Sequence, residues 1–243
     1  MARSFGAAAT AYESGRPEYP RAAVAWLLEP LRRERPLVVD VGAGTGKLTR
    51  IVAELGAEVV AVEPDPQMLA VLQEAVPGVS TSPGTAERLP CAEGSADAVV
   101  FGQAWHWVDA AAASREAARV LRPGGILGLI WNLRDESEPW IARMTQIMHG
   151  SNAEIMLAQG GPAIAAPFGA PETRAWTWSR QMTRASLMDM VRSRSYVITA
   201  APTERARIEQ ALERLFDEVG AIGDAIVQVP YVTRAYRVSL PAG

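Results

Sequence analysis

The chain has 243 residues, 49% of them hydrophobic and 21% charged, and its formal net charge at pH 7 is −3. This length suits one α/β domain, or a core with a small lid, and is too short for two full-sized domains. The charged residues lack the excess of Lys and Arg that is typical of nucleic-acid binders, so we expect neither a nucleic acid nor another large polyanion as partner.

The single cysteine fits a reducing compartment, and the hydropathy bears on signal and membrane segments. Cys91 is the only cysteine, which excludes an intramolecular disulfide and a cysteine-rich metal site. The first residues lack the apolar core of a signal peptide, and no later run is long enough to span a membrane. We therefore expect a cytoplasmic protein with no membrane contact and no metal, and the sequence leaves the oligomeric state open.

Residues 1–35 precede the first predicted strand. The turn-rich residues 12–20, Y-E-S-G-R-P-E-Y-P, come before a helical pattern at residues 24–33. The two tyrosines either pack this helix onto the domain or belong to a lid, and the sequence leaves both interpretations open.

A glycine-rich stretch at residues 38–47, V-V-D-V-G-A-G-T-G-K, is the strongest local signal. Its valines suit a buried parallel strand, and its three alternate glycines allow positive φ or close approach to a ligand. Residues 48–55 then have helical spacing, and the free N–H groups at a helix start can bind an anionic or polar group. The dinucleotide fingerprint G-x-G-x-x-G would need glycine at Lys47, which argues against a nucleotide-dependent oxidoreductase.

Two later segments place acids near the carboxyl edge of the predicted sheet. A strand at residues 58–62 ends at Glu63. An acid at that edge can accept both hydroxyls of a ribose, and a solvated loop acid is the alternative. A weak strand at residues 79–82 leads to Glu87, which can accept from an exocyclic amine.

The middle of the chain continues the alternation of strands and helices. A fourth strand at residues 98–101 precedes the segment Q-A-W-H-W. Asp109 then caps a helix that we expect to reach Leu121, before a turn at residues 122–125. An apolar run at residues 126–131 predicts the fifth, central strand.

Residues 134–171 interrupt this alternation, and their loop signals predict an insertion over the ligand edge. Beyond them we expect a sixth strand, a short helix, an amphipathic helix and a last strand. These elements occupy residues 174–183, 186–194, 208–219 and 231–238. Pro230 has no N–H for a ladder bond, so it should lie at the start of the last strand.

Several motifs occur in the order and approximate spacing of the class I S-adenosylmethionine (SAM) methyltransferases. They are D-V-G-A-G-T-G, V-V-A-V-E-P-D-P-Q-M-L, G-T-A-E-R-L-P, A-D-A-V-V-F-G-Q-A-W-H-W and R-V-L-R-P-G-G-I-L. Together they make the chain resemble this family, in its methyltransferase-11-like branch. The Y-E-S-G-R-P-E-Y-P and Q-A-W-H-W segments also resemble a small-molecule subgroup that includes trans-aconitate methyltransferase-like enzymes.

The resemblance implies a Rossmann-like α/β fold. Its seven-stranded, mostly parallel sheet would have helices on both faces, with the last strand antiparallel and inserted between the fifth and sixth. We expect a single SAM-dependent methyltransferase domain over residues 1–243, with an N-terminal lid segment at residues 1–35 and an insertion or lid at residues 134–171.

The resemblance also implies a cofactor site. Asp40 would orient the methionine amino group, Glu63 would hold the ribose, and the Gln103 carbonyl would accept from the methionine ammonium. The Ala86 N–H and the Glu87 carboxylate would meet the adenine. The residues expected to bind SAM, or its product S-adenosylhomocysteine (SAH), are Tyr12, Arg16, Asp40, Gly42, Ala43, Gly44, Gly46, Glu63, Pro64, Met68, Thr85, Ala86, Glu87, Gln103 and Ala104.

The acceptor needs few further groups, because the sulfonium is already an activated electrophile and the protein mainly aligns the reactants. A carboxylate is ionised at neutral pH, whereas a hydroxyl would benefit from a base such as His106, which otherwise packs or contacts the substrate. Arg16 and Arg134 bind a carboxylate or are surface arginines, and Trp131 lines the acceptor pocket or belongs to the core. The expected substrate residues are Tyr19, Trp105, His106, Trp107, Trp131 and Arg134.

The leading hypothesis is a SAM-dependent methyltransferase acting on a small organic acceptor, with a carboxylate or hydroxyl oxygen favoured. The alternative is a catalytically silent protein that binds SAM or SAH and acts by partner contact. An acceptor pocket filled by residues 134–171 would favour that alternative.

Overall fold

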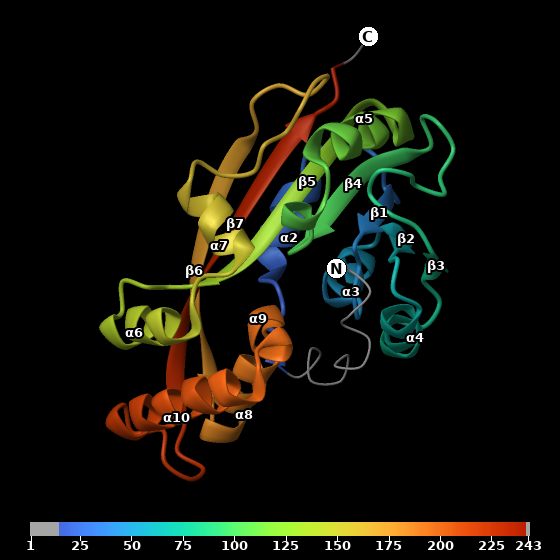
Figure 1. The fold of residues 1–243 in the computed structure, drawn as a ribbon. Helices are drawn as coiled ribbons and strands as arrows, with labels where there is room; N and C mark the ends of the chain where they lie inside the picture. The colour runs from blue at the N-terminus through green and yellow to red at the C-terminus, as the bar shows by residue number, and fades with distance from the viewer. Residues whose placement is uncertain (1–14, 242–243) are drawn as a thin grey trace.

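The computed structural model describes residues 15–241, apart from the side chains of Ser195 and Tyr196. Its centre is a seven-stranded sheet of order β3-β2-β1-β4-β5-β7-β6 with helices on both faces (Figure 1). The strands are β1 (Leu37–Val41), β2 (Glu58–Val62), β3 (Ser80–Ser82), β4 (Ala96–Gly102), β5 (Leu121–Arg134), β6 (Glu172–Met182) and β7 (Val227–Ser239). β1 to β5 pair in parallel, and β7 lies antiparallel between β5 and β6. The predicted fold class is therefore confirmed.

The helices cover both faces of the sheet and gather beyond one of its ends. They are α2 (Arg21–Leu28), α3 (Lys47–Glu54), α4 (Pro66–Ala75), the 3-10 helix η3 (Trp105–Trp107), α5 (Ala110–Val120), α6 (Pro139–Met148), α7 (Asn152–Ala158), α8 (Arg184–Arg192), α9 (Ser195–Thr199) and α10 (Pro202–Glu218). Within residues 15–241, no helix has the length and apolar character that crossing a membrane requires.

Both faces of the central strands are apolar. Val38 and Val100 pack with α2 and α3 on one face, whereas Val39 and Phe101 pack with α5 on the other. Successive residues of a strand point to opposite faces, so parallel strands that are covered on both sides form near-continuous apolar runs. The strand ends are therefore the places where polar side chains can meet a ligand.

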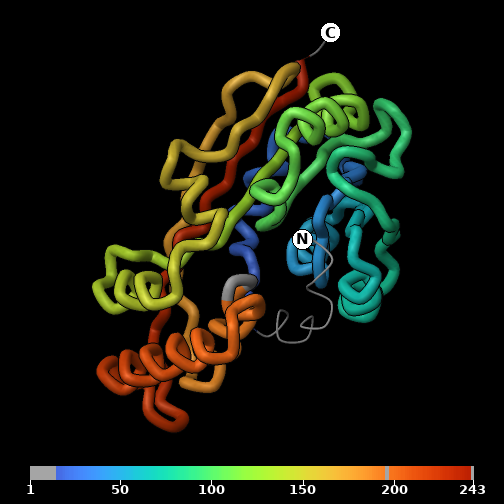
Figure 2. The backbone as a smooth tube through the Cα atoms, in the orientation of Figure 1, coloured from blue at the N-terminus to red at the C-terminus, as the bar shows by residue number. Residues whose placement is uncertain are grey.

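A second apolar cluster, the satellite core, surrounds the ends of β6 and β7. There α6, α8 and α10 pack around the two long strands (Figure 2). Its buried residues are Ile141, Met144, Met148, Met182, Leu187, Met188, Met190, Val191, Val197, Ile208, Leu212, Leu215, Phe216, Ala221, Val229 and Tyr231. Trp178 of β6 stacks on Tyr231 of β7 beside this core, with ring centroids 4.9 Å apart.

The boundary between α5 and β5 differs from the sequence expectation. α5 ends at Val120, and Leu121 already pairs with Ala96, so β5 includes the segment that we expected to form a separate turn. The register of β4 and β5 shifts after this pair, and Gly124 has a φ of 77°. Glycine allows such a conformation, so the Gly-Gly pair bulges the strand instead of preceding it.

Pro230 lies inside β7 and not at its start, as we had expected. Its main-chain oxygen accepts from the Asp135 N–H at 3.0 Å, so the hydrogen-bonding groups of Pro230 face the β5 side. The N and O atoms of one strand residue point to the same side of the strand. The last pair between β5 and β7 joins Arg134 to Tyr231. The missing N–H of the proline therefore lies one residue past the last β5–β7 pair, where the strand pairing has already ended.

We predict that Phe216→Ala destabilises the protein by about 3–5 kcal/mol, because the side chain is fully buried in the satellite core and its removal leaves a cavity. Equilibrium urea denaturation measures the effect. The exposed Glu213→Ala on the same helix is the matched control and should change the unfolding free energy by less than about 0.5 kcal/mol. Equal effects of the two substitutions would contradict the packing described for α10.

Candidate functional site

Asp40 brings a carboxylate into the interior near the end of β1. The residue is fully buried, Oδ2 accepts from Thr49 Oγ1 at 2.6 Å, and Oδ1 has no hydrogen-bond partner among the described residues. Burial raises the pKa of Asp40 to about 7, although the Thr49 hydrogen bond opposes the shift. The unpaired Oδ1 is a buried acceptor that suits a cationic donor.

The glycine loop after β1 has the backbone geometry that its sequence predicts. Gly42, Gly44 and Gly46 have φ values of 67°, 57° and 90°. A Cβ on Gly42 would lie 2.7 Å from the Cβ of Ala104, so only glycine fits where the loop passes the end of β4. A Cβ on Gly46 would lie 2.9 Å from Leu72 Cγ, so this glycine packs closely against α4.

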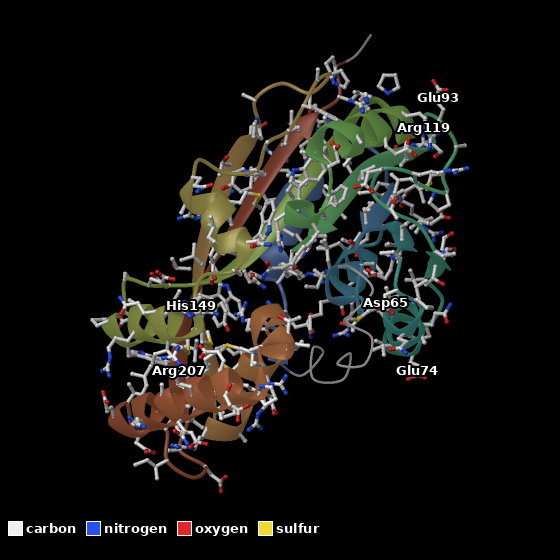
Figure 3. The ribbon with its side chains drawn as sticks, viewed as in Figure 1. Asp65, Glu74, Glu93, Arg119, His149 and Arg207 are labelled. Carbon is white, nitrogen blue, oxygen red and sulfur yellow. The ribbon has the colours of Figure 1, made fainter. Side chains whose placement is uncertain are left out.

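Glu63 joins the glycine loop to the end of β2. Its Oε2 accepts from the Gly44 N–H and its Oε1 from the Asp65 N–H, both at 3.0 Å. Burial raises the pKa of Glu63, against the opposing effect of these two bonds. Asp65 in turn caps α4 by accepting from the Gln67 N–H, and Figure 3 shows it at the start of that helix. The two acids thus fix the loops at the carboxyl edge of the sheet.

A cavity of about 420 Å³ opens at this edge. The expected site residues that line it are Arg16, Gly42, Gly44, Glu63, Pro64, Met68, Thr85, Ala86, Glu87, Gln103, Ala104, His106 and Trp107. Tyr19, Asp40 and Ala43 line a smaller cavity of about 40 Å³, which shares part of its lining with the large one. Tyr12 lies outside the described residues. The structure therefore brings most of the expected residues to one place.

The turn after β4 has an uncommon conformation. Gln103 has a φ of 55°, in the left-handed region that residues other than glycine rarely adopt. Its side-chain Nε2 donates to the Asn132 carbonyl and its main-chain N–H to the Ile130 carbonyl, both at 2.9 Å. These bonds to β5 stabilise the strained turn, and strain of this kind is common at functional sites.

His106 lies on the cavity wall with one ring nitrogen engaged. Nδ1 accepts a long hydrogen bond from Trp131 Nε1 at 3.4 Å. Burial lowers the pKa of His106 to about 4, and the positive charge of Arg16 adds to the shift. The ring is therefore neutral at neutral pH, and Nε2 carries the proton because Nδ1 is the acceptor.

Comparison with known proteins identifies the family. The family described as a methyltransferase domain matches residues 39–129. An uncharacterised methyltransferase of Mycobacterium tuberculosis is 42% identical over 241 residues, which cover 99% of this chain and 97% of the relative. The chain belongs to the class I SAM-dependent methyltransferases.

Solved structures agree with the methyltransferase fold. A type II methyltransferase from Anaeromyxobacter dehalogenans has a TM-score of 0.72 at 20% identity, covering 94% of this chain and 99% of that chain. Phosphoethanolamine N-methyltransferase 2 from Haemonchus contortus, solved with SAM, has a TM-score of 0.54 at 18% identity, covering 99% of this chain and 60% of that chain. SAM is the cofactor of this methyltransferase family, and two features of the structure fit it. The unpaired Oδ1 of Asp40 suits an ammonium group, and Gly42 and Gly44 bring main chain without side chains to the cavity wall.

Two of the expected substrate residues belong to the methyltransferase core. Trp105 packs edge-on against Phe101 at 4.8 Å, and its Nε1 donates to the Ala163 carbonyl at 2.9 Å. Trp131 is fully buried and packs edge-on against Tyr236 at 5.8 Å. Neither lines the large cavity, because each indole packs against other side chains behind the cavity wall.

Arg134, also expected at the acceptor, lies behind the cavity wall. Its Nη2 is 3.0 Å from Glu154 Oε1 and donates to Thr145 Oγ1 at 3.2 Å. Burial raises the pKa of Glu154, but Arg134, Arg194 and the hydrogen bonds with Ser151 together lower it overall. Arg134 therefore holds a residue of the wall and does not line the cavity itself.

Sequence reasoning missed part of the wall. Ser151, Ala153 and Glu154 at the start of α7 line the large cavity, and so does Arg194, the residue before α9. α7 begins with a capping box between Ser151 and Glu154, so the pattern S-N-A-E was an available signal for this helix. Arg194 has no such local signal, since its place depends on the packing of α8. His149, labelled in Figure 3, follows α6 and does not line the cavity.

We predict that Asp40→Asn changes how the stability of the ligand-free protein depends on pH. The folded state raises the pKa of Asp40 from 3.8 to about 7, so it binds this proton more tightly than the unfolded chain. The contribution of Asp40 to the unfolding free energy therefore falls as pH rises from about 4 to about 7 and then levels off. Urea denaturation across this range should show the unfolding free energy of the variant rising relative to that of the wild type as pH rises.

The exposed Asp224→Asn is the control for that experiment, and its profile should run parallel to that of the wild type. A parallel profile for Asp40→Asn would contradict a buried, protonatable Asp40.

We predict that Arg134→Met costs about 3–5 kcal/mol of unfolding free energy, because it leaves the buried Glu154 carboxylate without its partner. Thermal and urea denaturation measure the loss. Arg143→Met breaks the half-exposed pair with Glu218 and should have little effect, since solvent screens such a pair. An Arg134 variant as stable as the Arg143 variant would contradict the buried pair.

Proposed function

We propose that the chain transfers the methyl group of SAM to an oxygen of a small organic acceptor, with a carboxylate or hydroxyl favoured. The observation that carries this proposal is the cavity of about 420 Å³, which extends from Glu63 and Thr85 to Asn132, Ser151 and Arg194. Its volume falls within the range of about 300–1,000 Å³ of small-molecule sites. One end has the residues expected for the cofactor, and the other offers space and polar groups for an acceptor.

The cofactor end has a role for each expected residue. We propose that Asp40 Oδ1 and the Gln103 carbonyl accept from the ammonium, that Glu63 accepts from the ribose, and that Ala86 and Glu87 meet the adenine. The buried Asp40 oxygen and the position of Glu63 at the end of β2 support these roles. SAM, when bound, supplies a methyl group that is already activated by the sulfonium. The chain then has to orient the acceptor and exclude water.

His106 fits substrate contact better than proton removal. Its Nδ1 already accepts from Trp131, so the neutral ring presents an N–H and not a lone pair at its other nitrogen. An N–H donor can orient an acceptor oxygen without taking its proton. A carboxylate acceptor needs no base, because it is ionised at neutral pH. The resemblance to trans-aconitate methyltransferase-like enzymes adds weight to small carboxylic acids as the first acceptors to test.

We further propose that residues 1–243 form one domain in which residues 1–35 and 134–171 act as lids. Arg16 and Ser151, one from each segment, both line the large cavity, which supports this arrangement. A catalytically silent binding protein remains the alternative function. α7 forms part of the wall and leaves the cavity of about 420 Å³ beside it, so this segment does not fill the acceptor space.

We predict that SAH binds the wild type and that Glu63→Gln weakens the binding about tenfold to a hundredfold, since a hydrogen bond to a charged group is lost. Isothermal titration calorimetry measures both affinities. Glu58→Gln, at the exposed start of the same strand, is the matched control and should bind as the wild type does. SAH formation from SAM is then assayed with a panel of small carboxylic acids and alcohols.

Absence of SAH binding, or an unchanged affinity in Glu63→Gln, would contradict the cofactor site. SAH binding without methyl transfer to any member of the panel would favour the silent alternative.

A further inference from the structure

Arg194 is a buried cation in the wall of the large cavity. It lies between α8 and α9, is 7% exposed and lines the cavity together with Glu154. Its Nε has no hydrogen-bond partner among the described residues. Val191 and Val197 on either side are buried in the satellite core, so the main chain at Arg194 is held in place.

The carboxylate beside Arg194, that of Glu154, is already engaged by another arginine. Burial raises the pKa of Glu154, but Arg134, Arg194 and the hydrogen bonds with Ser151 together lower it overall and favour its ionised form. Its carboxylate makes its ion pair with Arg134, at 3.0 Å. Among the described residues, Arg194 therefore has no ion pair of its own.

A positive charge in a partly dehydrated cavity is stabilised when an anion replaces its water. A guanidinium presents a planar set of N–H donors that matches the two oxygens of a carboxylate. Arg16, which lines the same cavity, adds to the positive potential there. A neutral acceptor would dehydrate Arg194 and offer only weaker, uncharged hydrogen-bond acceptors in return, so the wall disfavours it.

We propose that Arg194 binds a carboxylate of the acceptor and is the residue that selects acidic acceptors over neutral ones of the same shape. This inference rests on the proposed methyl transfer to a small molecule and adds a specificity-determining residue to it. Arg194 lies outside the motifs that bind the cofactor, so its role is separable from cofactor affinity.

The test is calorimetric titration of the SAH-saturated protein with small mono-, di- and tricarboxylic acids, with the matching amides and with inorganic phosphate. We expect at least one acid to bind the wild type more tightly than its amide. In Arg194→Gln the affinity for that acid should fall about tenfold to a hundredfold, while the affinity for the amide stays unchanged. Arg194→Lys keeps the charge and loses the planar donors, so it should recover part of the affinity.

Arg214→Gln removes an exposed arginine of α10 and is the matched control; it should bind the acid as the wild type does. SAH affinity, measured first for every variant, reports correct folding of the cofactor site. Unchanged acid affinity in Arg194→Gln, an equal fall for acid and amide, tighter binding of phosphate than of any acid, or no acid binding at all would each overturn the proposal. Failure of the wild type to bind SAH would instead count against the proposed function.

Discussion

The hydrogen bond from the Gly44 N–H to the Glu63 carboxylate is the interaction on which the proposed cofactor end of the cavity depends. It connects the loop after β1 to the residue after β2. The sheet brings these two segments close together, and the hydrogen bond fixes one against the other. Glu63 also accepts from the Asp65 N–H, and Asp65 caps α4, so a single carboxylate orders the starts of two successive loops. Asp40 lies buried near the same edge, where burial raises its pKa as it does that of Glu63. Low solvent access makes both acids responsive to a polar or cationic ligand.

The fold and the backbone of the glycine loop could be predicted from the sequence because their signals are local. Alternate glycines, an acid at a strand end and an Asp-Pro helix start each constrain the backbone within a few residues. Gly42 and Glu63 each follow a strand, so the parallel pairing of β1 with β2 and β4 is enough to place both residues at the same edge of the sheet. Gly46 shows the limit of such reasoning, since its positive φ was predictable but its neighbour Leu72 comes from another helix.

The acceptor end could not be predicted in the same way, because its residues come from segments whose positions depend on tertiary packing. Trp105 and Trp131 looked like site residues for their place beside strand ends, yet the indoles of both are buried among core side chains. The sequence gives no signal for Arg194, because an arginine between two short helices is normally exposed. Its burial follows from the packing of α8 against α10 and β7, which the sequence pattern of α8 does not specify.

The long strands β6 and β7 place the two ends of the cavity on different hydrophobic cores. The helix α3, which follows the glycine loop, rests on the core formed with α2 and the centre of the sheet, whereas the segment around Arg194 rests on the satellite core. Substitutions that repack α8 or α10 can therefore move the acceptor wall while the cofactor loops keep their geometry. A scaffold divided in this way allows divergence in which descendants of one ancestral enzyme change the compound they modify and retain the same methyl donor.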